Sequence, residues 1–239
     1  MNHLDQEYIK NFYENLSEVW PKDNAWYLYL KSGIYTFIRK RYNSLNNPCI
    51  LNAGSGGNDY GILSDNMYHV DIAENKIANL KNAVVSSIEK LPFSDAMFDY
   101  SICVGSVINY CDAVASIAEM SRVTKKQGKL ILEFENSFSF EYFGRKEYGK
   151  SAEIINTKYM DQSEYLWVYS FDYIKKILKE FSFNIRNFSS FHILSSLYLR
   201  KHSNDENVAA KLAKFDCILR YIPYFKRRAS NIIMFCEKS

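Results

Sequence analysis

The spacing of apolar residues changes along the chain, from a helical period to short runs separated by helical segments. Large side chains recur at helical intervals from Leu4 to Trp20 and from Trp26 to Ile38, which predicts two amphipathic helices before the first strand. The alternation that follows is typical of a mostly parallel sheet. We expect strands at residues 49–51, 67–70, 83–86, 100–104 and 129–134, and helices at 74–81 and from Asp112 to about Lys126.

The pattern loosens in the second half of the chain. Residues 137–170 are aromatic and polar without a steady period, and this segment is too long for a plain connection, so we expect it to form a cap. A helix is predicted at 171–181, a strand within 183–199 and an amphipathic helix at 208–221. The apolar run NIIMFCEK at 231–238 is suited to a last strand.

The break between the first two strands is rich in glycine. It reads NAGSGGN, so Gly54, Gly56 and Gly57 place bare backbone directly after a buried strand. Exposed amides in such a turn, followed by a helix beginning at Asn58 or Asp59, favour binding of a carboxylate or phosphate. Ordinary loop glycines are the competing interpretation, and the glycines alone do not decide between the two.

An acid follows the second strand. The two oxygens of the Asp71 carboxylate could accept hydrogen bonds from both hydroxyls of a ribose, so the glycine turn and Asp71 together suggest a ribonucleoside ligand. The third glycine is not where a dinucleotide fingerprint places it, and the acid comes a little early. Nicotinamide binding is therefore the weaker interpretation.

Composition and charge narrow the class of protein. A chain of 239 residues that is 47% hydrophobic is long enough for one α/β domain with a full core. The net charge of +3 is too small to imply nucleic-acid or membrane binding by itself. The five cysteines form no metal-ligand pair, and neither a signal peptide nor a membrane-spanning run is apparent. We expect a soluble cytoplasmic protein that binds no metal.

Five segments occur in an order that resembles class I S-adenosylmethionine-dependent methyltransferases, of the small-molecule type with an LPF…FD element. They are ILNAGSGGN, HVDIAENKI, LPFSDAMFD, SICVGSVINY and AEMSRVTKKQGKLILEFE, and they cover roughly residues 49–135. The resemblance implies a doubly wound, Rossmann-like, mostly parallel seven-stranded sheet with an antiparallel last strand, two N-terminal helices and a substrate cap.

The resemblance also implies how the single domain of residues 1–239 is divided. Residues 1–45 would be the N-terminal helices and 46–135 the donor-binding core. Residues 136–170 would form the cap insertion, and 171–239 the second half of the sheet with a lid helix.

The same resemblance implies the contacts of the methyl donor, S-adenosylmethionine. Asn52 would meet its amino group, Asp71 its ribose, and Ser87 with Ile88 its adenine, and Ile72 would be a further donor contact. The remaining contacts would come from two turns: Gly54, Ser55 and Gly56 along the methionine portion, and Val104, Gly105 and Ser106 beneath the sulfonium. Asn52 and Ser87 stand where acids are usual, and the short segment before Asp71 predicts a first crossover helix trimmed by about a turn.

Methyl transfer from a sulfonium is an in-line displacement, which depends chiefly on positioning, so a catalytic side chain is optional. The candidates on the acceptor side are Tyr13, Trp20, Tyr110, Glu135 and His192. Glu135 could take a proton from a hydroxyl or an amine. The competing interpretations are core packing for Tyr13 and Trp20, a surface or capping role for Glu135, and a buried, hydrogen-bonded histidine for His192.

The sequence therefore predicts methyl transfer from S-adenosylmethionine to an oxygen or nitrogen of a small molecule or peptide. No nucleic-acid substrate is expected, because the fourth strand is followed by GSVINY and not by the NPPY-like signature of enzymes that methylate exocyclic base amines. Stable membrane association is not expected either. The alternatives are a nicotinamide-dependent oxidoreductase and a non-catalytic S-adenosylmethionine-binding protein.

Overall fold

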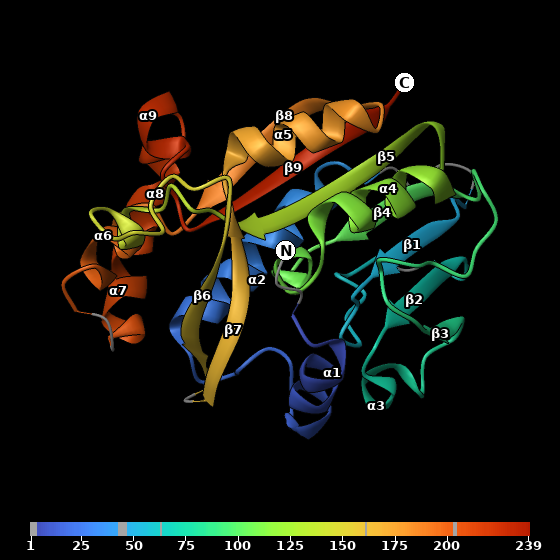
Figure 1. Cartoon of the computed structure of the whole chain (residues 1–239), viewed down its shortest axis with the longest axis horizontal. Coiled ribbons are helices and arrows are strands. Elements are labelled where there is room, and N and C mark those ends of the chain that lie inside the picture. The colour runs from blue at the N-terminus through green and yellow to red at the C-terminus, as the bar shows by residue number, and fades with distance from the viewer. Residues whose placement is uncertain (1–3, 43–46, 63, 161, 203–204) are drawn as a thin grey trace.

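The computed structural model describes residues 4–42, 47–62, 64–160, 162–202 and 205–239. Its centre is a seven-stranded sheet with the strand order β3-β2-β1-β4-β5-β9-β8 (Figure 1). The strands are β1 (Ile50–Ala53), β2 (Met67–Asp71), β3 (Ala83–Val85), β4 (Phe98–Cys103), β5 (Thr124–Glu135), β8 (Phe183–Phe191) and β9 (Asn231–Lys238). The helices are α1 (Gln6–Asn15), α2 (Ala25–Arg39), α3 (Glu74–Ile77), α4 (Ala113–Val123), α5 (Phe171–Glu180), α6 (Leu194–Leu199), α7 (Glu206–Leu212), α8 (Asp216–Leu219) and α9 (Pro223–Lys226), with single turns η1 (Val107–Tyr110), η2 (Phe140–Tyr142) and η3 (Ala213–Phe215).

The sheet has the predicted mixture of directions. The five strands from β3 to β5 pair in parallel, whereas β9 is antiparallel to both β5 and β8, between which it lies. The prediction of a mostly parallel seven-stranded sheet with an antiparallel last strand is confirmed. Parallel strands end at the same edge, so the segments that follow β1, β2 and β4 gather there.

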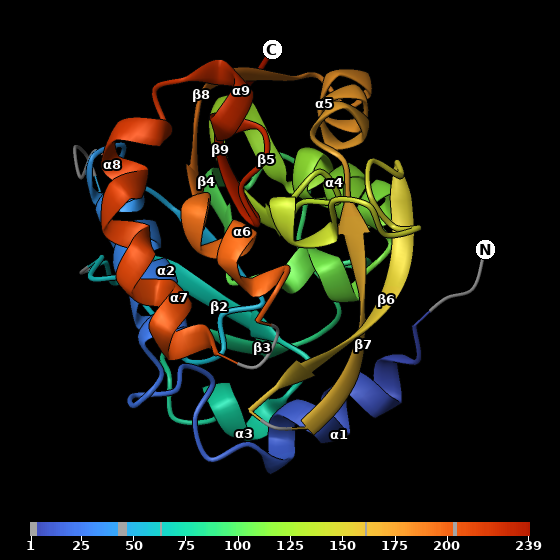
Figure 2. The same ribbon diagram turned by 90° about the vertical axis from the view of Figure 1, so that its left-hand side faces the viewer.

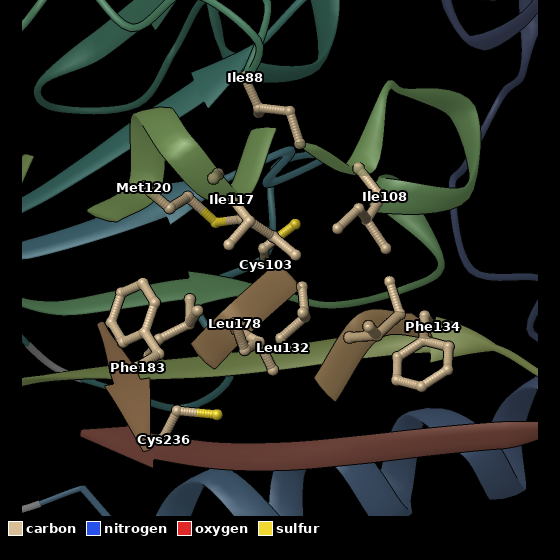
Figure 3. Packing of buried hydrophobic residues seen from close by; sticks show 14 of the residues in the cluster. Ile88, Cys103, Ile108, Ile117, Met120, Leu132, Phe134, Leu178, Phe183 and Cys236 are labelled. Atoms are coloured by element: carbon tan, nitrogen blue, oxygen red, sulfur yellow. The ribbon is translucent and has the colours of Figure 1, made fainter. Parts of the chain in front are cut away.

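Helices cover both faces of the sheet, because alternate residues of each strand point to opposite sides. On β4, Cys103 packs toward α4 and α5, while Ile102 packs toward α2. Figure 3 shows the first of these layers, where Ile117 and Met120 of α4 lie over the strands. Helix α4 begins as predicted, since the Asp112 carboxylate accepts hydrogen bonds from the first free amides of the helix.

The predicted cap segment forms a hairpin of two antiparallel strands, β6 (Ala152–Tyr159) and β7 (Gln162–Tyr169), outside the main sheet. Figure 2 shows it running from the end of the sheet toward α1. The Tyr8 hydroxyl on α1 donates a hydrogen bond to the Ser163 carbonyl at 3.1 Å, and the Tyr159 hydroxyl donates to the Val19 carbonyl. Helix α1 and the hairpin are therefore bound to each other.

The prediction of a helix between β1 and β2 is wrong. Between β1 and β2 the described residues form turns, and no helix begins at Asn58 or Asp59. Tyr60 and Gly61 have positive φ angles of 53° and 71°, which interrupt any helix at this point. The buried Tyr60 ring instead packs among the residues of α2, which covers the face of the sheet that a crossover helix would cover.

Other boundaries also differ from the predictions. Helix α1 ends at Asn15 and not at Trp20, and the amphipathic segment 208–221 is divided among α7, η3 and α8. Strand β5 begins directly at Thr124 with a bulge in its pairing to β4, where we predicted a helix to about Lys126 and a strand from residue 129. Among the described helices, none is both long and apolar enough to cross a bilayer.

Candidate functional site

A pocket opens where β1, β2 and β4 end. Because the glycine turn forms part of its wall, we call it the glycine-turn pocket. Nine of the residues expected to contact a donor line it: Gly54, Ser55, Gly56, Asp71, Ile72, Ser87, Ile88, Val104 and Gly105. The sheet thus brings together four chain segments that are far apart in sequence.

The first wall of this pocket is the turn after β1. The amides of Gly54 and Ser55 both donate hydrogen bonds to the Val70 carbonyl, at 2.8 and 3.0 Å. Gly54 has a φ of +68°, and a Cβ at this position would lie 2.2 Å from Cγ1 of Val107. A side chain cannot be accommodated here without movement of either the turn or η1, so the backbone of the turn stays bare.

Asp71 joins the glycine turn to β2. One carboxylate oxygen accepts a hydrogen bond from the Gly56 amide at 2.8 Å, and the other accepts from the Ala73 amide at 2.9 Å. Each oxygen has a second lone pair, so the carboxylate can still accept hydrogen bonds from a ligand. Burial raises the pKa of Asp71, and the backbone amides oppose this shift.

A buried acid, Glu133, accepts hydrogen bonds from the turn after β4 and was not among the residues predicted from the sequence. The amides of Gly105 and Ser106 donate to the same oxygen of Glu133, at 2.8 and 2.6 Å, and Asn231 Nδ2 donates to its other oxygen at 2.8 Å. Gly105 and Ser106 have φ angles of +82° and +59°. The useful signal was an acid inside the apolar run LILEF of a predicted central strand.

Two of the expected donor contacts do not line the glycine-turn pocket. Asn52 is buried beneath the turn, where its Nδ2 donates to the Asn58 carbonyl at 2.6 Å. Ser106 faces a different cavity, described next. Asn52 therefore shapes the turn in this structure, and Ser106 belongs to the neighbouring chamber.

A second chamber adjoins the glycine-turn pocket. The two share the wall residues Tyr13, Val19, Trp20, Gly105 and Tyr110. The outer walls of the second chamber come from α2, η2, α7 and the β6–β7 hairpin. A molecule in the second chamber would therefore face a molecule in the glycine-turn pocket across the wall that these five residues form.

Four of the five acceptor-side candidates lie in the second chamber: Tyr13, Trp20, Tyr110 and Glu135. The Tyr13 and Tyr110 rings meet edge to face at 5.5 Å, and the Tyr110 hydroxyl donates to Glu164 Oε2 at 2.7 Å. Burial raises the pKa of both tyrosines well above its usual value, so their hydroxyls stay protonated.

His192 lies outside the glycine-turn pocket and the second chamber. Its ring stacks on Trp26 with centroids 3.5 Å apart, and its two nitrogens lie 3.0 Å from Ser195 Oγ and 3.1 Å from the Trp26 carbonyl. Burial lowers its pKa to about 3, so the ring is neutral near pH 7. These contacts make His192 a structural histidine.

The second chamber gathers carboxyl groups that were not predicted together. Glu135 at the end of β5, Glu141 in η2 and Glu164 in β7 all face it. Burial, followed by the neighbouring carboxylates of Glu164, Glu133 and Glu141, raises the pKa of Glu135 to about 8. Burial also raises the pKa values of Glu141 and Glu164 to about 7. Of the three, only Glu135 was a candidate from sequence.

These shifts predict the pH dependence of stability. A carboxyl group whose pKa is raised on folding holds a proton that the unfolded chain releases, so its contribution to the free energy of unfolding falls as pH rises. For Glu164 this fall should run from about 4.5, its ordinary pKa, to about 7. We expect Glu164→Gln to flatten the fall and to unfold at higher urea concentration than the wild type at pH 8. Urea denaturation between pH 5 and 9 checks this; identical pH profiles would contradict it.

Comparisons with known proteins agree with this geometry. Residues 51–132 match a family model described as a methyltransferase domain. A search of curated proteins finds no match. A solved S-adenosylmethionine dependent methyltransferase from Mesorhizobium loti is 10% identical, with a TM-score of 0.54 over 87% of this chain and 100% of that one.

Two further solved structures contain bound S-adenosylhomocysteine. The 1,6-didemethyltoxoflavin-N1-methyltransferase of Burkholderia thailandensis is 13% identical, with a TM-score of 0.55 over 98% of this chain and 86% of that one. The geranyl diphosphate C-methyltransferase of Streptomyces coelicolor A3(2) is 11% identical, with a TM-score of 0.58 over 98% of each chain. At these identities the likeness concerns the fold.

The fold is that of class I S-adenosylmethionine-dependent methyltransferases. The domain match covers the glycine turn, Asp71 and the turn after β4, the segments that build the glycine-turn pocket. Residues 51–132 are therefore a methyltransferase domain on this fold. The nicotinamide alternative is set aside.

Proposed function

We propose that this methyltransferase binds S-adenosylmethionine in the glycine-turn pocket and transfers its methyl group to an oxygen or nitrogen of a molecule in the second chamber. The observation that carries the proposal is the wall that the two cavities share, at Tyr13, Trp20, Gly105 and Tyr110. In-line displacement needs donor and acceptor on opposite sides of one short gap, and two adjoining chambers supply that arrangement.

The residues of the glycine-turn pocket suit the parts of this donor. The bare backbone at Gly54 and Gly56 allows close approach of a flexible polar chain, and the free lone pairs of Asp71 suit a ribose diol. The aliphatic side chains of Ile72 and Ile88 offer apolar surface to an adenine ring. The donor supplies an activated methyl group, and the chain itself supplies position and shelter from water.

The size of the second chamber limits the acceptor. Its walls from α2, η2, α7 and the hairpin surround a space suited to a small molecule or one side chain of a peptide. The hairpin and α1 close over it, because Tyr8 and Tyr159 tie the hairpin to the N-terminal segment. This closure excludes water, which would otherwise separate the acceptor from the methyl group.

Removing the Asp71 carboxylate tests the donor site. We expect Asp71→Ala to weaken binding of S-adenosylhomocysteine by roughly tenfold or more, because charge-assisted hydrogen bonds to the ribose are lost. Isothermal calorimetry gives the affinity, and thermal unfolding shows whether the variant is folded. Asp65→Ala is the matched control, since Asp65 is an exposed acid just before β2 that pairs with Lys81. Unchanged affinity in a folded Asp71→Ala variant would mean that the ribose lies elsewhere.

Turnover is tested separately with a methyl-labelled donor. Incubation of the protein with labelled S-adenosylmethionine and a cell extract should transfer label to an acceptor, and mass spectrometry identifies the product. Asp71→Ala, assayed at a donor concentration well below saturation, should reduce labelling in proportion to its lost affinity. A protein that binds S-adenosylhomocysteine and labels nothing would support the alternative of a non-catalytic binding protein.

A further inference from the structure

We propose that the acceptor is a cationic amine, held by the carboxylates and aromatic rings of the second chamber and methylated on nitrogen. This inference rests on the proposed function and narrows it from oxygen or nitrogen to nitrogen. Three features support it: the charge of the chamber walls, the nature of their rings and the free acceptor capacity of one buried carboxyl group.

The charge of the second chamber is strongly one-sided. Four carboxyl groups line it, from Glu135, Glu141, Glu164 and Glu206. Among the described residues that line it, only Lys158 carries positive charge, and this side chain is exposed on β6. Carboxylates that crowd together in a partly dehydrated space repel one another, and either bound protons or a bound cation relieves this repulsion.

The acids of this chamber have hydroxyl partners rather than cationic ones. Glu164 accepts from the Tyr110 hydroxyl, Glu135 interacts with the Ser106 side chain and Glu141 with that of Ser230. None of the three forms an ion pair within the described part of the chain. Arg145 is a cationic neighbour of Glu141 and opposes the rise in its pKa, whereas no cation among the described residues does the same for Glu135 or Glu164. These two acids therefore lack the counterions that normally accompany buried carboxylates.

Glu164 has unused capacity aimed at the chamber. It lies on β7 and is only 3% exposed. Within the described residues, Tyr110 is the hydrogen-bond donor that reaches its carboxyl group, and it engages Oε2. The other oxygen, Oε1, can accept the N–H of a bound ammonium group, an interaction stronger than a neutral hydrogen bond.

The remaining walls favour a cation as well. Aromatic rings line the chamber on several sides, from Trp20, Trp26, Tyr27, Tyr142 and Tyr159. The Tyr27 and Tyr159 rings meet edge to face at 5.0 Å, which fixes their orientation. The faces of aromatic rings attract ammonium groups, and this attraction grows when water is excluded.

The transfer step balances without a further reactant. The ammonium first gives one proton to a chamber carboxylate, Glu135 or Glu164, and becomes a neutral amine with a lone pair. That lone pair forms the new N–C bond as the C–S bond of the donor breaks, and the sulfur keeps the bonding electrons and becomes a neutral thioether. The product is a methylated ammonium, and the carboxyl group later returns its proton to water.

Three probes of similar size and different charge test this inference. They are 2-phenylethylamine, 2-phenylethanol and 3-phenylpropanoate, titrated by calorimetry into protein saturated with S-adenosylhomocysteine. We expect the amine to bind at least tenfold more tightly than the alcohol and the carboxylate to bind least. Equal affinities, a preference for the alcohol or carboxylate, or no binding of the amine would overturn the inference.

Variants then test whether the carboxyl groups of the second chamber cause the preference for the amine. Glu164→Gln and Glu135→Gln keep the shape of each side chain, and we expect each to reduce amine affinity about tenfold while leaving the alcohol unchanged. Glu153→Gln on the same hairpin is the matched control, because Glu153 does not line the second chamber, and it should bind all three probes as the wild type does. An amine preference that survives in both chamber variants would refute the assignment to these acids.

These experiments distinguish failure of the amine inference from failure of the proposed function. The titration with S-adenosylhomocysteine is performed first and reports on the donor site alone. If it succeeds and the amine fails, only the inference is lost, whereas failure of the donor to bind removes the proposed function. The labelled product from the extract provides a second test: an N-methyl group supports the inference, and an O-methyl group overturns it.

Discussion

Replacing Gly54 with alanine is expected to weaken donor binding by about a hundredfold or more. The added Cβ would lie 2.2 Å from Cγ1 and 2.5 Å from Cγ2 of Val107, and the backbone φ of +68° is strained for any residue with a side chain. Left-handed strain costs about 1–2 kcal/mol, and overpacking typically adds about 1–3 kcal/mol. If the turn relaxes to avoid this cost, it loses the shape that accommodates the donor. A hundredfold loss corresponds to about 2.7 kcal/mol.

Two further variants separate the causes of this loss. Gly149→Ala introduces similar backbone strain, at a φ of +74°, in the segment before β6 and away from the glycine-turn pocket. It should lower the urea midpoint and leave the affinity for S-adenosylhomocysteine unchanged. Adding Val107→Ala to Gly54→Ala removes the two shortest contacts, leaves Cβ of residue 107 at 2.9 Å and keeps the backbone strain, so we expect partial recovery of affinity. Wild-type affinity in Gly54→Ala itself would show that the turn does not hold the donor.

The glycine turn and Asp71 were predictable because their signals are local. An apolar strand, three glycines and an acid after the next strand lie within about twenty residues, and the parallel sheet brings the ends of those strands together. The nearby crossover helix was predicted wrongly for a reason that is not local. The face it would cover is covered by α2, from residues 25–39, and the buried Tyr60 packs against that helix.

The acidic chamber was missed because its members come from separate elements. Glu135 ends β5, Glu141 lies in a single turn and Glu164 lies in the hairpin, and each alone reads as an ordinary surface acid. One signal was nevertheless present. In the run QSEYLWVY, Glu164 shares the period-two face of the buried residues Leu166 and Val168, and an acid on an apolar strand face is unusual.

The fold of this protein does not determine which acceptor it methylates. Solved structures with the same fold include an N1-methyltransferase of 1,6-didemethyltoxoflavin and a C-methyltransferase of geranyl diphosphate, so the sheet does not determine the acceptor. The glycine-turn pocket is built by the sheet, whereas the second chamber is closed by α1, α7 and the hairpin. Acceptor chemistry therefore has to be sought in the residues that these peripheral elements contribute.

Glu133→Ala is expected to be the most destabilising of these substitutions, with a loss of about 3–5 kcal/mol in the free energy of unfolding, as when one partner of a buried charged network is removed. Glu133 is fully buried, and truncation leaves three donors without their acceptor: the amides of Gly105 and Ser106 and the side chain of Asn231. A domain has only about 5–15 kcal/mol of stability, so little would remain. Urea denaturation followed by tryptophan fluorescence measures the loss.

Two comparisons show whether the carboxylate acts by holding the turn after β4. Glu133→Gln keeps one oxygen that can accept from both backbone amides, so it should retain more stability and most of the donor affinity. Glu237→Ala removes an acid from the neighbouring strand β9, where the carboxylate pairs with Lys129 and Arg186 at the surface, and should cost clearly less. If Glu133→Ala proves no more harmful than Glu237→Ala, the left-handed turn at Gly105 and Ser106 is stable on its own. In that case the buried acid would have no part in forming the wall between the two cavities.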